Sequence, residues 1–203
     1  MEQQPKGAGP ETTGNQEHEE QERLHEDQPR IYVASLTDYN AGVLHGTWID
    51  ATNDVDGMQY EINKMLAGSP SGNAEEFAIH DYDNFGTYRV DEYDSLGWIA
   101  KIAAGIHEHS LAFAAWADQC DHDEDTLDRF EDAYLGDWTS VEDYAENLLD
   151  DTGILTELDN AIPDTLRPYV DIDIAGFARD LELSGDITSV DHPGGVWIFD
   201  GLL

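Results

Sequence analysis

The spacing of hydrophobic residues divides the first part of the chain into short elements. RIYVASL at 30–36 alternates as β-strands do, and TWIDA at 47–51 predicts a second strand. Hydrophobic residues recur three or four positions apart over 54–67, which predicts a helix. EEFAIHDYDNFG at 75–86 predicts a strand followed by a turn. Strands with one helix packed against them predict a small α+β domain over 30–93.

The middle of the chain has the spacing of helices. Residues 95–119 are rich in alanine and apolar on most sides, which predicts one central, buried helix. A second helix is predicted over about 123–134, and both belong to a helical domain over 94–139. A third helix is predicted over 140–151, because SVED at its start resembles a capping box and a glycine follows its end.

The last part of the chain predicts a second small α+β domain, over 140–203. PYVDIDIAGFARDLELSG at 168–185 predicts a helix that ends at its glycine. DITSV at 186–190 and GVWIF at 195–199 predict two strands around the turn DHPGG. The composition of residues 1–29 predicts a disordered, acidic and Gln-rich tail. The expected fold class is therefore α+β, as an elongated chain of three small domains: α+β, helical and α+β.

Charge changes this picture more than any motif does. The 203 residues include 45 acidic and 9 basic ones, a formal net charge of −36, while 40% are hydrophobic, enough to build folded cores. Such a charge disfavours direct binding to nucleic acid or to an anionic membrane and favours a basic partner. Cys120 is the single cysteine, which excludes an intrachain disulfide and a cysteine-based zinc cluster. Because the sequence shows neither a signal peptide nor an apolar run that could span a bilayer, we expect a cytoplasmic protein.

The sequence shows no constellation typical of catalysis or of cofactor binding. DHDEDTLDRFED at 121–132 has acids at the first ligand positions of an EF-hand loop, but Thr126 stands where that loop needs glycine and Asp132 where it needs glutamate. His107 and His109 are expected on different faces of their helix, so they do not share a metal. Motifs for a nucleophilic serine and for phosphate or dinucleotide binding are absent. We therefore expect neither an enzyme nor a cofactor or metal site.

The acids of the middle helices are expected on the sides that face away from the hydrophobic residues. At about 100° per residue, Leu127, Phe130 and Tyr134 share one side of their helix and several acids share another. Two interpretations of these acidic stripes remain open. One is the solvated surface of an acidic, halophile-type, non-enzymatic structural or interaction protein, and the other is imitation of nucleic acid. In the second case the DNA-mimic surface would comprise Asp121, Glu124, Asp125, Asp128, Asp132, Asp137, Glu142, Asp143, Glu146, Asp150 and Asp151.

If the acids imitate nucleic acid, the net charge indicates how long a duplex they could imitate. Residues 1–29 contain eight acids and two bases, so residues 30–203 hold 37 acids and seven bases, a net charge of −30. B-form DNA carries one negative charge per about 1.7 Å of its axis, so thirty charges match about 15 base pairs, or about 50 Å of duplex. Three small domains in a row could reach that length, and a dimer would double it.

Several segments, taken as a set, resemble one known family. They are RIYVASLTDYNAGVLHGTWIDA at 30–51, EEFAIHDYDNFG at 75–86, YAENLLDDTGIL at 144–155, LRPYVDIDIAGFARDLELSGDI at 166–187 and GVWIF at 195–199. In order and spacing they resemble the antirestriction protein ArdA family, over essentially all of the chain after the tail. YVASLTDYNAG, AIHDY and ARDLELSGD are the most specific of these matches, and the helical middle is the weakest.

The resemblance implies a fold, a function and a partner. ArdA proteins are carried by mobile genetic elements, and they are elongated, acidic homodimers with three small domains per chain. The dimer imitates bent B-form DNA and occupies the DNA-binding groove of Type I restriction–modification enzymes, without catalysis or a cofactor. The resemblance thus implies that acids on the outer faces of the second and third domains stand in for phosphates. The tail is additional to the family pattern, and the acidic run at 121–132 falls in its variable region.

The resemblance also implies a subunit contact. YAENLLDDTGILTEL at 144–158 matches the position of the family's antirestriction motif, which lies near the contact between subunits. The candidates for the dimer contact are the apolar residues Tyr144, Leu148, Ile154 and Leu155.

Overall fold

The structure, a computed structural model, describes residues 28–52 and 54–203. The tail predicted over 1–29 therefore lies almost wholly outside the described residues. Contacts between residues divide the chain into two compact units, with the boundary after Ala114. Each unit combines helices with a three-stranded antiparallel sheet, which confirms the mixture of helices and small sheets that the α+β class requires. The division into three domains stays a prediction.

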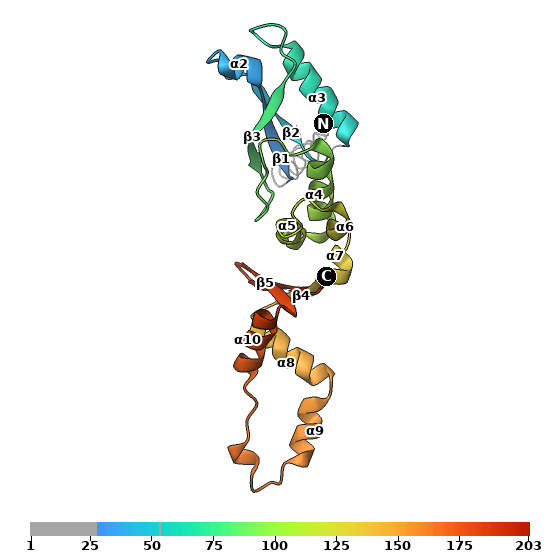
Figure 1. The fold of residues 1–203 in the computed structure, drawn as a ribbon, viewed down its shortest axis with the longest axis vertical. Helices are drawn as coiled ribbons and strands as arrows, with labels where there is room; N and C mark the ends of the chain where they lie inside the picture. The colour runs from blue at the N-terminus through green and yellow to red at the C-terminus, as the bar shows by residue number, and fades with distance from the viewer. Residues whose placement is uncertain (1–27, 53) are drawn as a thin grey trace, which may run out of the picture. The chain divides into compact units, whose positions relative to one another are not determined.

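The first unit is built around a sheet in the order β2-β1-β3 (Figure 1). Its strands, β1 (Arg30–Ser35), β2 (Gly46–Asp50) and β3 (Phe77–Asp83), confirm the three strands predicted for this part of the chain. Ile31 and Val33 of the central strand are completely buried, because alternate residues of β1 point into the core. The helix α3 (Val55–Ala67) packs on this sheet through buried methionine, isoleucine and leucine side chains, as the helical spacing predicted.

Two helices of this unit begin at a residue whose side chain caps them. The helix α2 (Leu36–Asn40) was not predicted; it begins directly after β1, where the Ser35 hydroxyl accepts a hydrogen bond from the Asp38 N–H at 3.2 Å. Asp54 caps α3 in the same way, accepting from the Gly57 N–H at 2.7 Å. Both caps satisfy backbone donors that the first turn of a helix leaves without partners.

The single helix predicted over 95–119 was wrong, because the structure has two helices there. They are α4 (Leu96–His109) and α5 (Leu111–Ala117), separated by Ser110 at φ 64° and ψ −166°, far from helical values. The break lets the ring of Phe113 pack onto Gly105, where a side chain would leave it no room. The predicted burial of this segment is confirmed, since Trp98, Ile99 and most of α5 lie in the core.

In the second unit, one helix was predicted over 123–134, and this prediction was also wrong. The structure has two short helices, α6 (Glu124–Leu127) and α7 (Phe130–Ala133), followed by a strand, β4 (Tyr134–Trp138). The strand forms because it pairs with β6 more than fifty residues later in the chain, a partner that local spacing does not show. The ring of Phe130 stacks on that of Tyr134, with centroids 5.1 Å apart.

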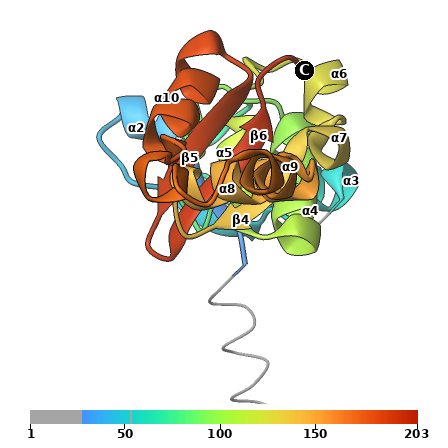
Figure 2. The same ribbon diagram turned by 90° about the horizontal axis from the view of Figure 1, so that it is seen from below.

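The sheet of the second unit has the order β4-β6-β5, with β5 (Ile187–His192) and β6 (Gly195–Asp200) forming the predicted hairpin. Ile198 and Phe199 of the central strand are completely buried. Two helices, α8 (Val141–Asp151) and α10 (Ile174–Ser184), lie side by side (Figure 1) and share a hydrophobic core with the sheet. The end of α10 at Gly185, a left-handed residue, confirms the predicted glycine stop, and α10 lies next to β5 (Figure 2).

The connection between α8 and α10 contains more structure than the sequence predicted. Gly153, at φ 73°, ends α8 as expected, but a further helix, α9 (Ile154–Ala161), begins directly after it. A single turn of 3-10 helix, η1 (Arg167–Tyr169), follows before α10. The connection is therefore a helix followed by residues 162–173, which we call the return segment, and no residue of α9 is buried.

Candidate interaction surface

The acidic helix α8 starts where the sequence predicted it. The Ser140 hydroxyl accepts a hydrogen bond from the Asp143 N–H at 3.1 Å, and the Asp143 carboxylate accepts one from the Thr139 hydroxyl at 3.0 Å. The capping serine is thus confirmed, although the carboxylate bonds to the preceding threonine rather than to the cap itself. Glu142 and Asp143 lie in the first turn, where negative charge is favoured by the helix dipole.

One side of α8 is buried and the other is acidic. Ala145 is completely buried, and Tyr144 and Leu148 pack against the same hydrophobic core. The ring of Tyr144 meets that of Trp138 edge to face at 5.5 Å, and its burial, together with the charge of Asp200, raises the pKa of the Tyr144 hydroxyl. The acids predicted for the outer side, listed in chain order, are all exposed: Glu142, Asp143, Glu146, Asp150 and Asp151.

Three of these carboxylates share one groove. Asp143, Glu146 and Asp150 line a cavity of about 390 Å³, together with Trp138, Asn147 and Leu155. Residues three or four positions apart on a helix have Cβ atoms about 5–6 Å apart, so the three form a row along α8. The row lies on a packed helix rather than on a loop, so its spacing is fixed by the fold.

The segment before β4, which carries further acids, is also held by buried side chains. Leu127 and Phe130 are 1% and 4% exposed, and the indole N–H of Trp116 donates to the carbonyls of Thr126 and Leu127, both at 3.2 Å. Asp123 caps α6, accepting from the Asp125 N–H at 3.2 Å, and it also accepts from the Thr126 hydroxyl at 2.7 Å. The acids predicted for the outer side of this segment are all exposed: Asp121, Glu124, Asp125, Asp128 and Asp132.

Asp137, the remaining acid of the predicted DNA-mimic surface, is exposed and has a fixed partner. The Nε2 atom of His192 lies 3.0 Å from its carboxylate. The other ring nitrogen, Nδ1, accepts a hydrogen bond from the Gly194 N–H, so Nε2 carries the proton and donates it to Asp137. The imidazole also stacks on Trp197 with centroids 4.3 Å apart. This contact joins β4 to the β5–β6 hairpin and orients the Asp137 carboxylate.

The first unit contributes acids that the sequence analysis did not select. Tyr93 is 71% exposed, and the charge of Glu92 raises the pKa of its hydroxyl, with Asp91 and Glu76 adding to the effect. Three carboxylates from two separate segments therefore act on this hydroxyl through their charge. The run DEYD in the sequence was a signal for part of this cluster, but the approach of Glu76 depends on the fold.

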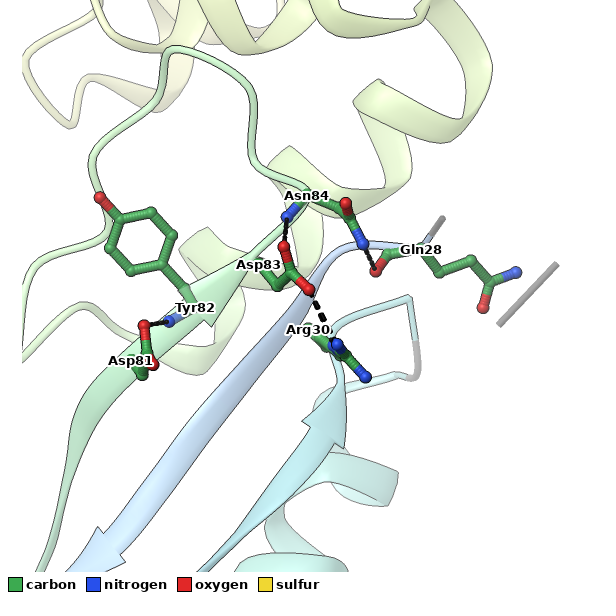
Figure 3. A network of polar contacts seen from close by, with 6 residues as sticks. All are labelled: Gln28, Arg30, Asp81, Tyr82, Asp83 and Asn84. Atoms are coloured by element: carbon green, nitrogen blue, oxygen red, sulfur yellow. Dashed lines mark hydrogen bonds and ion pairs between the residues drawn. The ribbon is translucent and has the colours of Figure 1, made fainter. Parts of the chain in front are cut away.

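One of the few cations of the first unit is already engaged (Figure 3). The guanidinium of Arg30 lies 2.8 Å from the Asp83 carboxylate and 4.8 Å from the centre of the Trp48 ring. Next to it, the side-chain amide of Asn84 donates to the backbone carbonyl of Gln28 at 3.0 Å. Half-exposed ion pairs of this kind add little to stability, so their main effect here is to tie the ends of β1 and β3 together.

The residues predicted for the dimer contact occupy two different settings. Tyr144 and Leu148 pack against the core of their own unit, whereas Ile154 is 49% exposed on α9. Leu155 lines a second groove of about 250 Å³, whose apolar lining continues through Leu158, Ile162, Val170, Ile172 and Ile174 and whose acidic lining is Glu146, Asp159 and Asp171. The sequence analysis missed the return-segment part of this surface, where Leu166, Tyr169 and Val170 are also exposed. Several exposed apolar side chains in one region, as along α9 and the return segment, are typical of an interface.

No three histidine, cysteine, aspartate or glutamate side chains in residues 28–52 and 54–203 are placed to hold a metal ion. His109 instead stacks on Phe113, with centroids 5.9 Å apart. In the same ranges no helix has both the length and the apolar character that crossing a membrane would require.

Comparison with known proteins gives one family. Residues 31–194 match the model of a family described as antirestriction protein (ArdA), which covers four-fifths of the chain. The match includes nearly all of the first sheet, the strands β4 and β5 of the second, and all of the exposed acids described above, and it ends just before β6. No curated protein matches the chain.

Proposed function

The chain belongs to the ArdA family of antirestriction proteins, and we propose that it acts by imitating DNA. In this proposal it occupies the DNA-binding groove of a Type I restriction–modification enzyme inside the cell and so blocks restriction of incoming DNA. The observation that carries the proposal is the exposure of all eleven predicted acids on packed elements of the second unit. A rigid row of carboxylates presents negative charge at fixed spacing, as the phosphates of a duplex do.

Rigidity matters for the strength of such binding. An acidic segment without a core would lose conformational freedom on binding, and that ordering would cost affinity. Here the acids of α8 stand above Ala145, and those before β4 stand above Leu127 and Phe130, all of which are buried. Binding by such a surface needs no reaction and no cofactor, so we propose inhibition by occupancy alone.

A homodimer would extend the acidic array. The apolar groove along α9 and the return segment lies next to the acidic groove of α8, since Glu146 and Leu155 line both. We propose that a second copy covers the apolar groove through α9, with Ile154 and Leu155 at the contact. The acids of both copies would then form one longer array, and the family motif at 144–158 would serve the dimer and the acidic surface together.

The proposal is tested in cells that carry a Type I enzyme. Expression of the protein is expected to raise the plating efficiency of unmodified phage, because the enzyme is occupied. A variant with Glu142→Gln, Glu146→Gln, Asp150→Asn and Asp151→Asn should protect less, since it keeps the shape of α8 and loses four charges. Asp143 is left in place because its carboxylate bonds to Thr139 at the start of the helix.

The matched control changes the same four positions but keeps the charge: Glu142→Asp, Glu146→Asp, Asp150→Glu and Asp151→Glu. It should protect nearly as well as the wild type. Failure of the wild-type protein to protect against any Type I enzyme, when it is folded and abundant, would exclude the proposed function. Equal protection by all three proteins would show that the acids of α8 are not part of the working surface.

A further inference from the structure

The first unit displays a small apolar surface that neither the acidic surface nor the dimer contact explains. Tyr39, Val43 and Leu44 are 57%, 39% and 74% exposed. They lie close together, because the Val43 N–H donates to the Asp38 carbonyl at 2.9 Å and so folds the chain back on α2. The ring of Tyr39 meets that of His80 edge to face at 4.7 Å, which fixes its direction. We call these three residues the apolar tip.

The apolar tip is held rigidly. Asp38, next to Tyr39, is completely buried, and among the described residues it is the only buried side chain that carries a charge. Its carboxylate accepts a hydrogen bond from the Ser71 N–H at 3.0 Å, and its carbonyl accepts from both Ala41 and Val43. The bond from Ser71 to one carboxylate oxygen, Oδ1, thus ties α2 to the loop at 68–73. The tip is therefore not a loose loop.

The surroundings of the tip are acidic. Residues 31–88 contain nine acids and one base, Lys64. Two of the acids belong to segments next to α2: the Leu36 N–H at the start of α2 donates to the backbone carbonyl of Glu76, and Asp81 follows the histidine that Tyr39 contacts. Both carboxylates are exposed. In Figures 1 and 2, α2 lies on one side of the first unit and α3 on the other.

We propose that the apolar tip is an anchor that docks on the DNA-reading surface of the restriction–modification enzyme, a proposal that rests on the proposed function above. Proteins that read DNA place apolar groups against base edges, such as the methyl group of thymine, between the cations that hold the phosphates. An apolar centre on an acidic unit has the complementary arrangement: Tyr39 and Leu44 meet the apolar groups, and exposed acids of the first unit, such as Asp81, meet the cations.

The anchor and the acids contribute differently as salt changes. Ionic contacts are screened as the salt concentration rises, whereas burial of apolar surface is not. The total affinity should therefore contain a salt-dependent part from the acids and a nearly salt-independent part from the tip. Large aromatic side chains such as tyrosine commonly dominate the free energy at an interface centre, so the second part should be measurable.

The test is a displacement titration against a labelled duplex bound to a purified Type I methyltransferase core, at a series of salt concentrations. Tyr39→Ala/Leu44→Ala is expected to weaken competition about tenfold or more at every salt concentration, without changing the slope of log affinity against log salt. The matched control is Tyr60→Ala/Leu183→Ala, which removes a tyrosine and a leucine that are also exposed, 67% and 78%, and should leave competition unchanged. Thermal unfolding and light scattering of each variant verify fold and mass.

The possible results of the titration distinguish failure of the proposed anchor from failure of the proposed function. Competition by the wild type together with an unchanged affinity of Tyr39→Ala/Leu44→Ala would overturn the anchor and leave DNA mimicry standing. Absence of competition by the wild type would overturn both. A fall in the mass of Tyr39→Ala/Leu44→Ala from that of two chains to one would show that the tip joins copies of this chain, which also overturns the anchor.

Discussion

The completely buried carboxylate of Asp38 accepts a hydrogen bond from the backbone N–H of Ser71 at 3.0 Å, across more than thirty residues of sequence. Burial alone would raise the pKa of Asp38, but the polar groups of Ser71, Ser35 and Ser69 around the carboxylate outweigh it and hold that pKa well below its usual range. The carboxylate is therefore ionised in the folded protein at neutral pH. It fixes the segment that carries the apolar tip.

Asp38→Asn is expected to lower the free energy of unfolding in a pH-dependent way. A carboxyl group whose pKa is depressed by folding stabilises the folded state above its unfolded pKa of about 3.9, and this contribution is lost as the pH falls towards the folded pKa. The difference between wild type and variant should be constant above about pH 5 and shrink below about pH 4. Urea unfolding at several pH values measures it. Asp56→Asn, at an exposed site, should show a small difference throughout, and a wild-type-like Asp38→Asn at neutral pH would contradict the account.

Two glycines of α4 should respond in opposite ways to the same change. A methyl group at Gly105 would lie 2.3 Å from the ring of Phe113, whereas at Gly97 the nearest atom is the Ser95 hydroxyl oxygen at 4.0 Å. Gly105→Ala is expected to lower the free energy of unfolding by about 1–3 kcal/mol, because the ring must move. Gly97→Ala should raise it by up to about 1 kcal/mol, through helix propensity. Chemical denaturation of both variants decides this, and a stabilised Gly105→Ala would show that α5 does not pack there.

The lone cysteine should be unreactive in the folded protein. Cys120 is 3% exposed, and burial, with the charge of Asp123 adding to it, raises the pKa of its thiol to about 12. Because the thiolate is the nucleophile, a disulfide reagent should modify Cys120 slowly at neutral pH and rapidly in denaturant. Fast modification of the native protein, measured by absorbance, would show that the α5–α6 turn opens readily.

The dimer contact can be tested away from the hydrophobic core. Ile154→Asp/Leu158→Asp adds charge to the exposed side of α9, which contributes no buried residue, so the fold should persist. The mass in solution is expected to fall from that of two chains to 22.6 kDa, and competition with DNA should weaken because the acidic array is halved. The matched control is Leu183→Asp on α10, where the side chain is 78% exposed. Light scattering of an unaltered dimer in Ile154→Asp/Leu158→Asp would place the contact elsewhere.

Local patterns predicted those elements whose causes are local. The start of α8 followed from Ser140 and the spacing of hydrophobic residues after it, and Gly185 marked the end of α10. Strand β4 was missed because its stability comes from pairing with β6, far along the chain. The break at Ser110 was missed because neither glycine nor proline marks it; it comes from the packing of Phe113 on α4.

The surfaces also divide into those that local sequence patterns predicted and those that depend on the fold. Helical spacing was enough to identify the exposed acids, since residues opposite an apolar stripe face solvent. The cluster around Tyr93 and the return-segment part of the apolar groove join segments distant in sequence, so spacing alone did not indicate them. The burial of Asp38 had no signal in the sequence, because an aspartate in a short helix is ordinarily exposed.

DNA mimicry is tested most directly by competition with DNA itself. A labelled duplex bound to a Type I methyltransferase core would be titrated with the wild-type protein at low and at moderate salt. The account predicts displacement at near-stoichiometric amounts at low salt, and weaker displacement as salt screens the contacts between carboxylates and basic residues. A folded protein that leaves the duplex bound at both salt concentrations would contradict the account.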